Sequence, residues 1–342
     1  MRCRIRSLPI SANWSMLTLL VMLALLFPGA VLAERPLIAM DGQKIVTGSS
    51  VRFRVQPSLE AEIVGRVGLG AVVHATRRTK EKLQTGGLNS YWYFISASDK
   101  QGWISGSFLR DFKPEKREQI WFKIIRERMD NPELSFTDCV ALYRFVNLVA
   151  DKTDNKKMQS AFDLGRLLAL QKAFDKVNWE NAQHEPYLSW VKEHKEAKRV
   201  FHDEISGQWL VPSTDYWKLA DAYKGRKGED EISWYAANAQ LGGECEGDID
   251  CNLRRDVITQ GEYLRRLPYG RYAGASLKRL SASLDYIQQA LKQEPNYFRD
   301  FRTAGEPIET LFEIIASSNP KLTERAVAMK QIKAIRRVFD QR

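Results

Sequence analysis

The 342-residue sequence lacks an apolar run long enough to cross a lipid bilayer. The run over residues 16–27 (MLTLLVMLALLF) has 12 residues, whereas a membrane-spanning helix needs about 20. Three arginines precede this run, and a Pro-Gly break and Val31–Ala33 follow it, which is the order of parts in a cleavable secretion signal. We therefore expect a signal peptide over residues 1–33, export to the periplasm or to the medium and cell surface, and no integral membrane span after cleavage.

Signatures of nucleic-acid binding are also missing. The sequence has no long basic run and no RNP, zinc-finger or helix-turn-helix motif. Cleavage after residue 33 would remove three arginines and no acid, so the formal charge would fall from +10 to +7 over the remaining 309 residues. A surplus of this size allows weak attraction to anionic surfaces such as cell-wall polymers. We expect no nucleic-acid partner.

Cysteine is scarce, with four residues in the whole chain. Cys3 would leave with the signal peptide, and Cys245 and Cys251 are the only close pair among the rest. Because export places the protein in an oxidising compartment, we expect a disulfide between Cys245 and Cys251. Cys139 is then the odd cysteine, and we expect it to be a buried thiol.

The segment around that cysteine pair is acidic and rich in glycine, but it lacks a complete metal-binding pattern. Asp248, Asp250 and Asn252 begin like a calcium loop, yet Leu253 stands at the glycine position and Thr259 at the position of the bidentate carboxylate. Zinc would need a second Cys/His pair at ligand spacing, which is absent. Glycine-rich phosphate loops and Ser/His/Asp arrangements are absent too. We expect no metal, no cofactor and no catalytic residues, and we interpret the segment as a disulfide-stapled loop.

Short strands are predicted before residue 113, where glycine is frequent and β-branched residues alternate with polar ones. Turn signals separate these runs. The expected strands cover residues 43–47, 51–55, 63–67, 71–75, 91–96 and 101–105. Such a set favours a small β-barrel.

Four segments of this region carry a family pattern. They are Val51–Ser58 (VRFRVQPS), Ile63–Gly70 (IVGRVGLG), Trp92–Ile95 (WYFI) and Gly102–Leu109 (GWISGSFL). In this order they resemble the bacterial SH3 (SH3b) family over residues 40–112. The resemblance implies an SH3-like barrel that recognises peptides or cell-wall material.

The resemblance directs attention to aromatic and basic residues near the ligand-binding loops. The loop 76–90 is longer than is usual in the family and is rich in basic residues. Strand alternation turns the two tyrosines beside Trp92 away from that tryptophan. The other tryptophan of the pattern is either a ligand contact or a barrel-closing residue. The candidate ligand-binding residues are Tyr91, Tyr93, Trp103, Arg77 and Arg78.

The chain from residue 114 to 342 is predicted to be helical. Pro114 suits a helix start, and Ser135 suits the cap of a following helix. Further helices are expected over residues 155–177, 186–201, 213–224, 228–240, 252–265, 271–293, 305–317 and 321–341. Short turns between them indicate an all-α bundle or a short irregular solenoid, with a weak likeness to tetratricopeptide-like helical proteins. We interpret His184, His194 and His202 as solvated surface residues.

The first functional hypothesis is an exported, non-enzymatic binding or scaffold protein. Its barrel would recognise a cell-wall or protein peptide, and its helical domain would hold a partner, with peptidoglycan or an envelope protein as candidates. The alternative is a peptidoglycan hydrolase of the cell envelope, or a non-catalytic activator of one. Asp138-Cys139 resembles the start of the nucleophile motif in a family of wall-cutting cysteine peptidases. That motif's Ser-Gly and a histidine on a later strand are missing, so we interpret Cys139 as a core residue.

Overall fold

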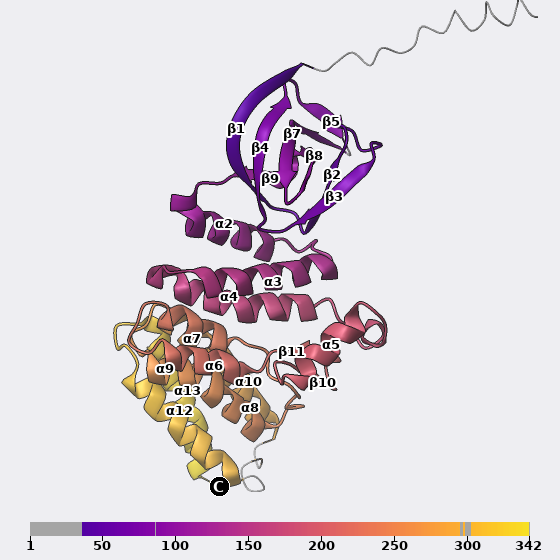
Figure 1. Ribbon diagram of the computed structural model, residues 1–342. Coiled ribbons are helices and arrows are strands. Elements are labelled where there is room, and N and C mark those ends of the chain that lie inside the picture. The colour runs from indigo at the N-terminus through magenta and orange to yellow at the C-terminus, as the bar shows by residue number, and fades with distance from the viewer. Residues whose placement is uncertain (1–35, 86, 295–296, 298–301, 342) are drawn as a thin grey trace, which may run out of the picture.

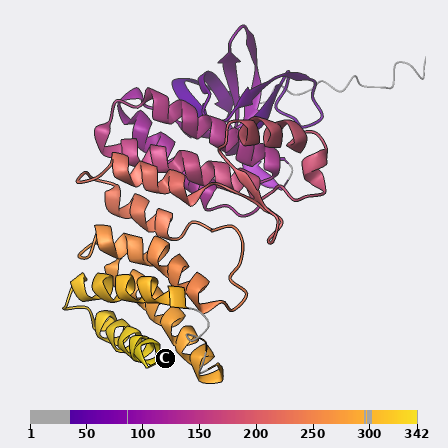
Figure 2. The same ribbon diagram turned by 90° about the horizontal axis from the view of Figure 1, so that it is seen from below.

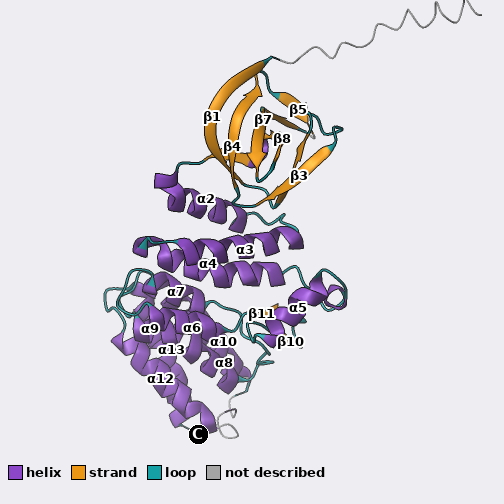
Figure 3. Ribbon diagram, viewed as in Figure 1, coloured by secondary structure: helices purple, strands orange, loops and turns teal. Residues whose placement is uncertain are grey.

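The computed structural model describes residues 36–85, 87–294, 297 and 302–341. The predicted signal peptide therefore lies outside the described residues. Strands gather in the N-terminal part and helices fill the rest of the chain (Figure 3). This arrangement confirms the predicted fold class, an SH3-like β-domain followed by a helical domain.

The N-terminal domain is an antiparallel sheet of seven strands in the order β3-β2-β8-β7-β4-β1-β9, which curls into a small barrel (Figure 1). A separate hairpin, β5–β6, forms within the long basic loop. The strands are β1 (Leu37–Val46), β2 (Ser50–Arg54), β3 (Ile63–Gly68), β4 (Val72–Thr79), β5 (Leu83–Thr85), β6 (Leu88–Ser90), β7 (Trp92–Ala97), β8 (Lys100–Ser105) and β9 (Leu109–Asp111).

The barrel forms because its strands alternate apolar and polar residues with a period of two. Val51 and Phe53 of β2, together with Ile95 of β7 and Ile104 of β8, lie in one buried cluster. The residues between them face the other side of the sheet. That outer face of the barrel therefore carries the charged and aromatic side chains.

The helical domain follows in chain order away from the barrel, as the steady change of colour in two views shows (Figures 1 and 2). Its α-helices are α2 (Arg117–Met129), α3 (Phe136–Lys152), α4 (Lys156–Phe174), α5 (Tyr187–Glu196), α6 (Ser213–Ala222), α7 (Glu229–Ala237), α8 (Ile249–Asp256), α9 (Glu262–Arg266), α10 (Ala273–Gln293), α12 (Gly305–Ser317) and α13 (Thr323–Asp340). Among the helices that the structure describes, none combines the length and the apolar character that crossing a membrane requires.

Local signals placed most of these helices correctly. Ser135 caps α3 in a capping box, because its hydroxyl accepts from the Asp138 amide while the Asp138 carboxylate accepts from the Ser135 amide. Pro114 opens a short 3-10 turn that leads into α2. A five-residue π-turn, Val257–Gly261, joins α8 to α9 inside the segment that the sequence predicted as one helix.

Two expectations for the helical domain were wrong. Strands β10 (Phe201–Asp203) and β11 (Gln208–Leu210) form a short hairpin where no strand was expected. His194 has no exposed surface. It packs against Trp190, with ring centroids 4.1 Å apart, and also against Tyr143 and Phe174. His194 therefore lies on the core face of α5, although the residues around it in the sequence are polar.

The barrel and the first helices share one apolar core. Ile45 of β1 is completely buried in the same cluster as the α3 residues Leu142 and Phe145, and Leu69 and Phe112 pack against that cluster. Gly70, with a φ of +80°, lies against the Phe145 ring so closely that a Cβ atom there would overlap with it. The barrel is therefore docked on α3.

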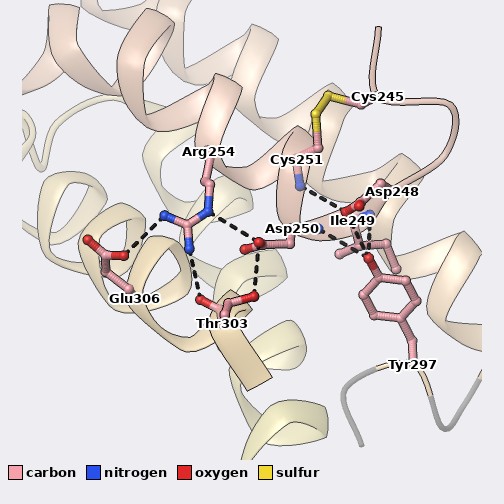
Figure 4. Close-up of polar contacts among 9 residues, drawn as sticks. All are labelled: Cys245, Asp248, Ile249, Asp250, Cys251, Arg254, Tyr297, Thr303 and Glu306. Atoms are coloured by element: carbon pink, nitrogen blue, oxygen red, sulfur yellow. Dashed lines mark hydrogen bonds and ion pairs between the residues drawn. A yellow bond between two sulfur atoms is a disulfide. The ribbon is translucent and has the colours of Figure 1, made fainter. Parts of the chain in front are cut away.

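The predicted disulfide between Cys245 and Cys251 is present and staples the loop before α8 to the first turn of that helix (Figure 4). Inside the staple, Asp248 caps α8 by accepting from the Cys251 amide at 2.9 Å. The Tyr297 hydroxyl donates to the same carboxylate at 2.9 Å and accepts from the Ile249 amide at 3.0 Å. The loop thus ties α8 to the segment after α10.

Candidate functional site: a cleft between barrel and helices

A cleft of about 1390 Å³ lies between the barrel and the helical domain. Strands β2 and β3 supply one wall, and α3 and α5 supply the floor and the opposite wall. Figure 1 shows β3 and α5 on either side of α3. The site depends on the docked barrel, because neither domain encloses it alone.

The barrel wall of the cleft is basic. Arg52 follows the inward residue Val51, so alternation places it on the outer face of β2. Arg54 follows a register shift in the β2–β3 pairing and is buried, with 8% of its surface exposed. Arg66 of β3 stands directly opposite Arg52 in the strand register. These three arginines line the cleft, and Arg52 and Arg66 are exposed. Like charges directly opposite each other destabilise a strand pair, so this pair favours an anion nearby.

Two buried tryptophans from the two domains also line the cleft. Trp92 of β7 is 1% exposed and Trp190 of α5 is 5% exposed. Neither indole N–H has a hydrogen-bond partner among the described residues. Tryptophan combines a large apolar surface with one donor, and these two make the lining partly aromatic.

The floor and the far wall come from helical residues at helical spacing. On α3, Thr137, Ala141, Arg144 and Leu148 form one stripe along the cleft. The far wall and the approach to α3 add acidic residues, which are Glu133, Glu185 and Glu193. The helical side of the cleft is therefore mixed, with acids in the majority.

A polar network at the inner end of the cleft fixes the barrel on the helices. Arg128 of α2 donates to the Thr47 carbonyl at 3.0 Å and to the Ser49 hydroxyl at 2.5 Å. Ser49 and Arg128 both contact the Asp138 carboxylate. Burial by itself raises the pKa of Asp138, but the hydrogen bonds from Ser135 and Ser49 and the charge of Arg128 hold it below its ordinary value. The carboxylate therefore stays ionised and binds the barrel loop at neutral pH.

The sequence-predicted ligand residues lie elsewhere on the barrel, because none of the five lines the cleft. Arg77 stacks on Phe94 at 4.2 Å and lies 5.8 Å from the ring of Trp103, which is 7% exposed. Arg78 stacks on Tyr91 at 4.1 Å.

Tyr93, the last of the five, packs partly against the barrel core, with Lys44 4.8 Å from its ring. The structure thus brings four of the five residues into two separate cation–aromatic pairs on the outside of the barrel, and the fifth pairs with a lysine of β1. Their role as ligand contacts stays a prediction.

The cleft residues were not identified from the sequence, because only the barrel wall of the cleft has a recognisable sequence pattern. The alternation of Val51 and Phe53 with Arg52 already placed one arginine of the cleft on the outer face of β2. The sequence offered no means of pairing this face with α5, which lies more than 130 positions later. The facing acids therefore carried no recognisable pattern.

Cys139 is completely buried and free, as predicted. Burial raises the pKa of its thiol, which disfavours the thiolate that a nucleophile needs. Within the described residues, no group of three or more His, Cys, Asp or Glu side chains is placed to hold a metal ion.

Comparison with known families agrees with this description of the barrel. Residues 49–110 match the bacterial SH3 domain family, so the barrel is an SH3b domain, as the sequence motifs indicated. No curated protein and no solved structure matches the chain. The class is thus an SH3b domain docked on a helical domain, and a bacterial SH3 domain suggests a ligand-binding or cell-wall-binding role.

Proposed function

We propose that this chain is an exported, non-enzymatic binding protein of the cell envelope, and that the cleft binds a peptide segment of the cell wall or of an envelope protein. The observation that carries the proposal is the 1390 Å³ cleft, whose walls come from both the SH3b domain and the helical domain. The helical domain would hold the partner together with the barrel.

The size and the lining of the cleft favour an extended chain over a compact small molecule. Small-molecule pockets usually enclose about 300–1000 Å³ and are mostly apolar. This cleft is larger, and its lining combines two tryptophans with charged side chains of both signs. A peptide offers carbonyl acceptors, apolar side chains and charged groups along one line. The faces around Arg77 and Arg78 are a second proposed contact for a long ligand.

The test is co-sedimentation of mature protein, residues 34–342, with purified peptidoglycan sacculi. We expect the wild type to bind and Ala141→Trp, which fills the cleft floor, to lose binding. Ala326→Trp is the matched control, because Ala326 is exposed on α13, away from the cleft. Circular dichroism shows whether each variant is folded.

Two further results would redirect the proposal. If Tyr91→Ala/Tyr93→Ala loses binding while Ala141→Trp retains it, the outer face of the barrel is the site and the cleft is not. Mass-spectrometric detection of wall fragments released by the wild type would favour the hydrolase alternative.

A further inference from the structure

We infer that the cleft selects a peptide whose charges are segregated, with an anionic end against the barrel and a cationic end against α5. This inference rests on the proposed function, because it names the ligand class of the same cleft. It follows from how the two walls distribute their charges.

The barrel contributes positive charge alone to the cleft. Its charged lining residues are Arg52, Arg54 and Arg66, and no barrel acid lines the site. Arg52 has no ion-pair partner among the described residues, and Arg66 makes only a 3.4 Å contact with the Ser50 hydroxyl. Arg54 is buried and donates to the Ala61 carbonyl, so Arg52 and Arg66 are the exposed positive charges of this wall. Carboxylates are the peptide groups that bind arginines best.

The helical side contributes mostly negative charge. Arg128 and Asp138 are paired with each other, at 3.2 Å, and so add no net charge. The remaining acids are Glu133, Glu185 and Glu193, against the single cation Arg144. Glu193 makes two distant contacts, with Arg199 and with the His194 ring, each at 3.9 Å. An ammonium group of a ligand is therefore the favoured counterion for this wall.

The two walls do not neutralise each other. No ion pair joins the barrel arginines to Glu133, Glu185 or Glu193 in the part of the chain that the structure describes. Opposite charges that share a cleft without touching leave room for a ligand between them. A ligand with the matching separation replaces water at both walls at once, whereas a uniformly charged chain is repelled by one of them.

Five synthetic octapeptides with blocked ends test this inference on the folded protein, residues 34–342, by isothermal titration. One carries two glutamates at one end and two lysines at the other, and a second has the same composition with the charges interleaved. The third has four glutamates and the fourth has four lysines. The fifth is the segregated peptide in the reverse direction, so that both binding polarities are tested. We expect one segregated peptide to bind about tenfold more tightly than the interleaved one.

Variants assign each end of the peptide to a wall. Arg52→Ala/Arg66→Ala and Glu185→Gln/Glu193→Gln should each weaken the segregated peptide about tenfold. The matched controls Lys80→Ala/Lys113→Ala and Glu196→Gln/Glu204→Gln remove the same charge from exposed positions outside the cleft and should change nothing. Arg52→Glu/Arg66→Glu should gain affinity for the four-lysine peptide, a result that misfolding does not produce.

Equal affinity for segregated and interleaved peptides, failure of every peptide to bind, or variants that behave like their controls would each overturn the inference. The sacculus assay with Ala141→Trp is independent of these outcomes. If that assay supports the cleft while the peptides show no charge preference, the proposed function stands and the segregated ligand is withdrawn.

Discussion

At the scale of single residues, the burial of His194 makes the free energy of unfolding depend on pH. Burial lowers its pKa from 6.5 to about 4, while Glu193 raises it and Arg199 lowers it to smaller extents. The unfolded chain therefore binds more protons at this position between pH 4 and 6.5. The free energy of unfolding contributed by His194 is present above pH 6.5 and falls as the pH decreases through this window.

We predict that His194→Phe removes this pH dependence. Between pH 7 and pH 5 the free energy of unfolding of the variant should rise by about 2 kcal/mol relative to the wild type, measured by urea denaturation at each pH. The variant is compared with the wild type at each pH because a second group also titrates in this range. Burial raises the pKa of Asp256 to about 7, and the contribution of that carboxyl to the free energy of unfolding falls as the pH rises.

His184→Ala is the control for His194→Phe, since His184 is exposed. It should leave the pH dependence unchanged. Parallel curves for His194→Phe and the wild type would show that His194 is not held neutral by burial.

At the scale of elements, the loop before α8 depends on a covalent and a polar constraint together. The disulfide holds Cys245 to the first turn of α8, and Asp248 caps that turn while contacting Tyr297. A seven-residue loop closed by a disulfide gains about 2 kcal/mol in the chain-entropy account. The cap adds to this, so local order at α8 should depend on both.

We predict that Cys245→Ser/Cys251→Ser lowers the free energy of unfolding by about 2 kcal/mol in urea denaturation. Hydrogen exchange at the Ile249 and Cys251 amides should accelerate, because their partners lose a fixed position. A reducing agent should reproduce the loss in the wild type and have no further effect on the variant. Unchanged stability on reduction would contradict a stapling role.

At the scale of the whole molecule, the barrel and the first helices share one core. Ile45 belongs to the core of α3, and the network of Arg128, Ser49 and Asp138 closes the same junction. A domain that places residues in its neighbour's core does not unfold without exposing that core.

We predict that the barrel and helices α2 to α4 unfold in the same calorimetric transition. Gly70→Ala should lower its midpoint by several degrees, because Gly70 has a φ of +80° and faces the Phe145 ring. Gly87→Ala is the matched control, with a φ of +79° and open space around the added Cβ, and should cost less. Separate transitions for the barrel and for α2 to α4, or equal effects of the two substitutions, would contradict the shared core.

What the sequence by itself determined is local. The period-two alternation around Val51 and Phe53 predicted the strands, the Ser135 cap predicted the start of α3, and the short spacing of Cys245 and Cys251 predicted the disulfide. Each of these signals joins residues within one turn, one strand or one short loop, where backbone geometry leaves few alternatives. The SH3b motifs belong to the same class, since they lie along consecutive strands.

Only the tertiary structure decided which faces meet. The burial of His194 and the cleft between Arg52 and Glu185 both depend on contacts between distant segments. Those contacts depend on how apolar faces fit against each other, because packing of whole side chains, unlike a turn or a cap, has no fixed spacing along the chain. The periodicity of the sequence therefore predicts the strands and helices, whereas the cleft exists only because the barrel docks on α3.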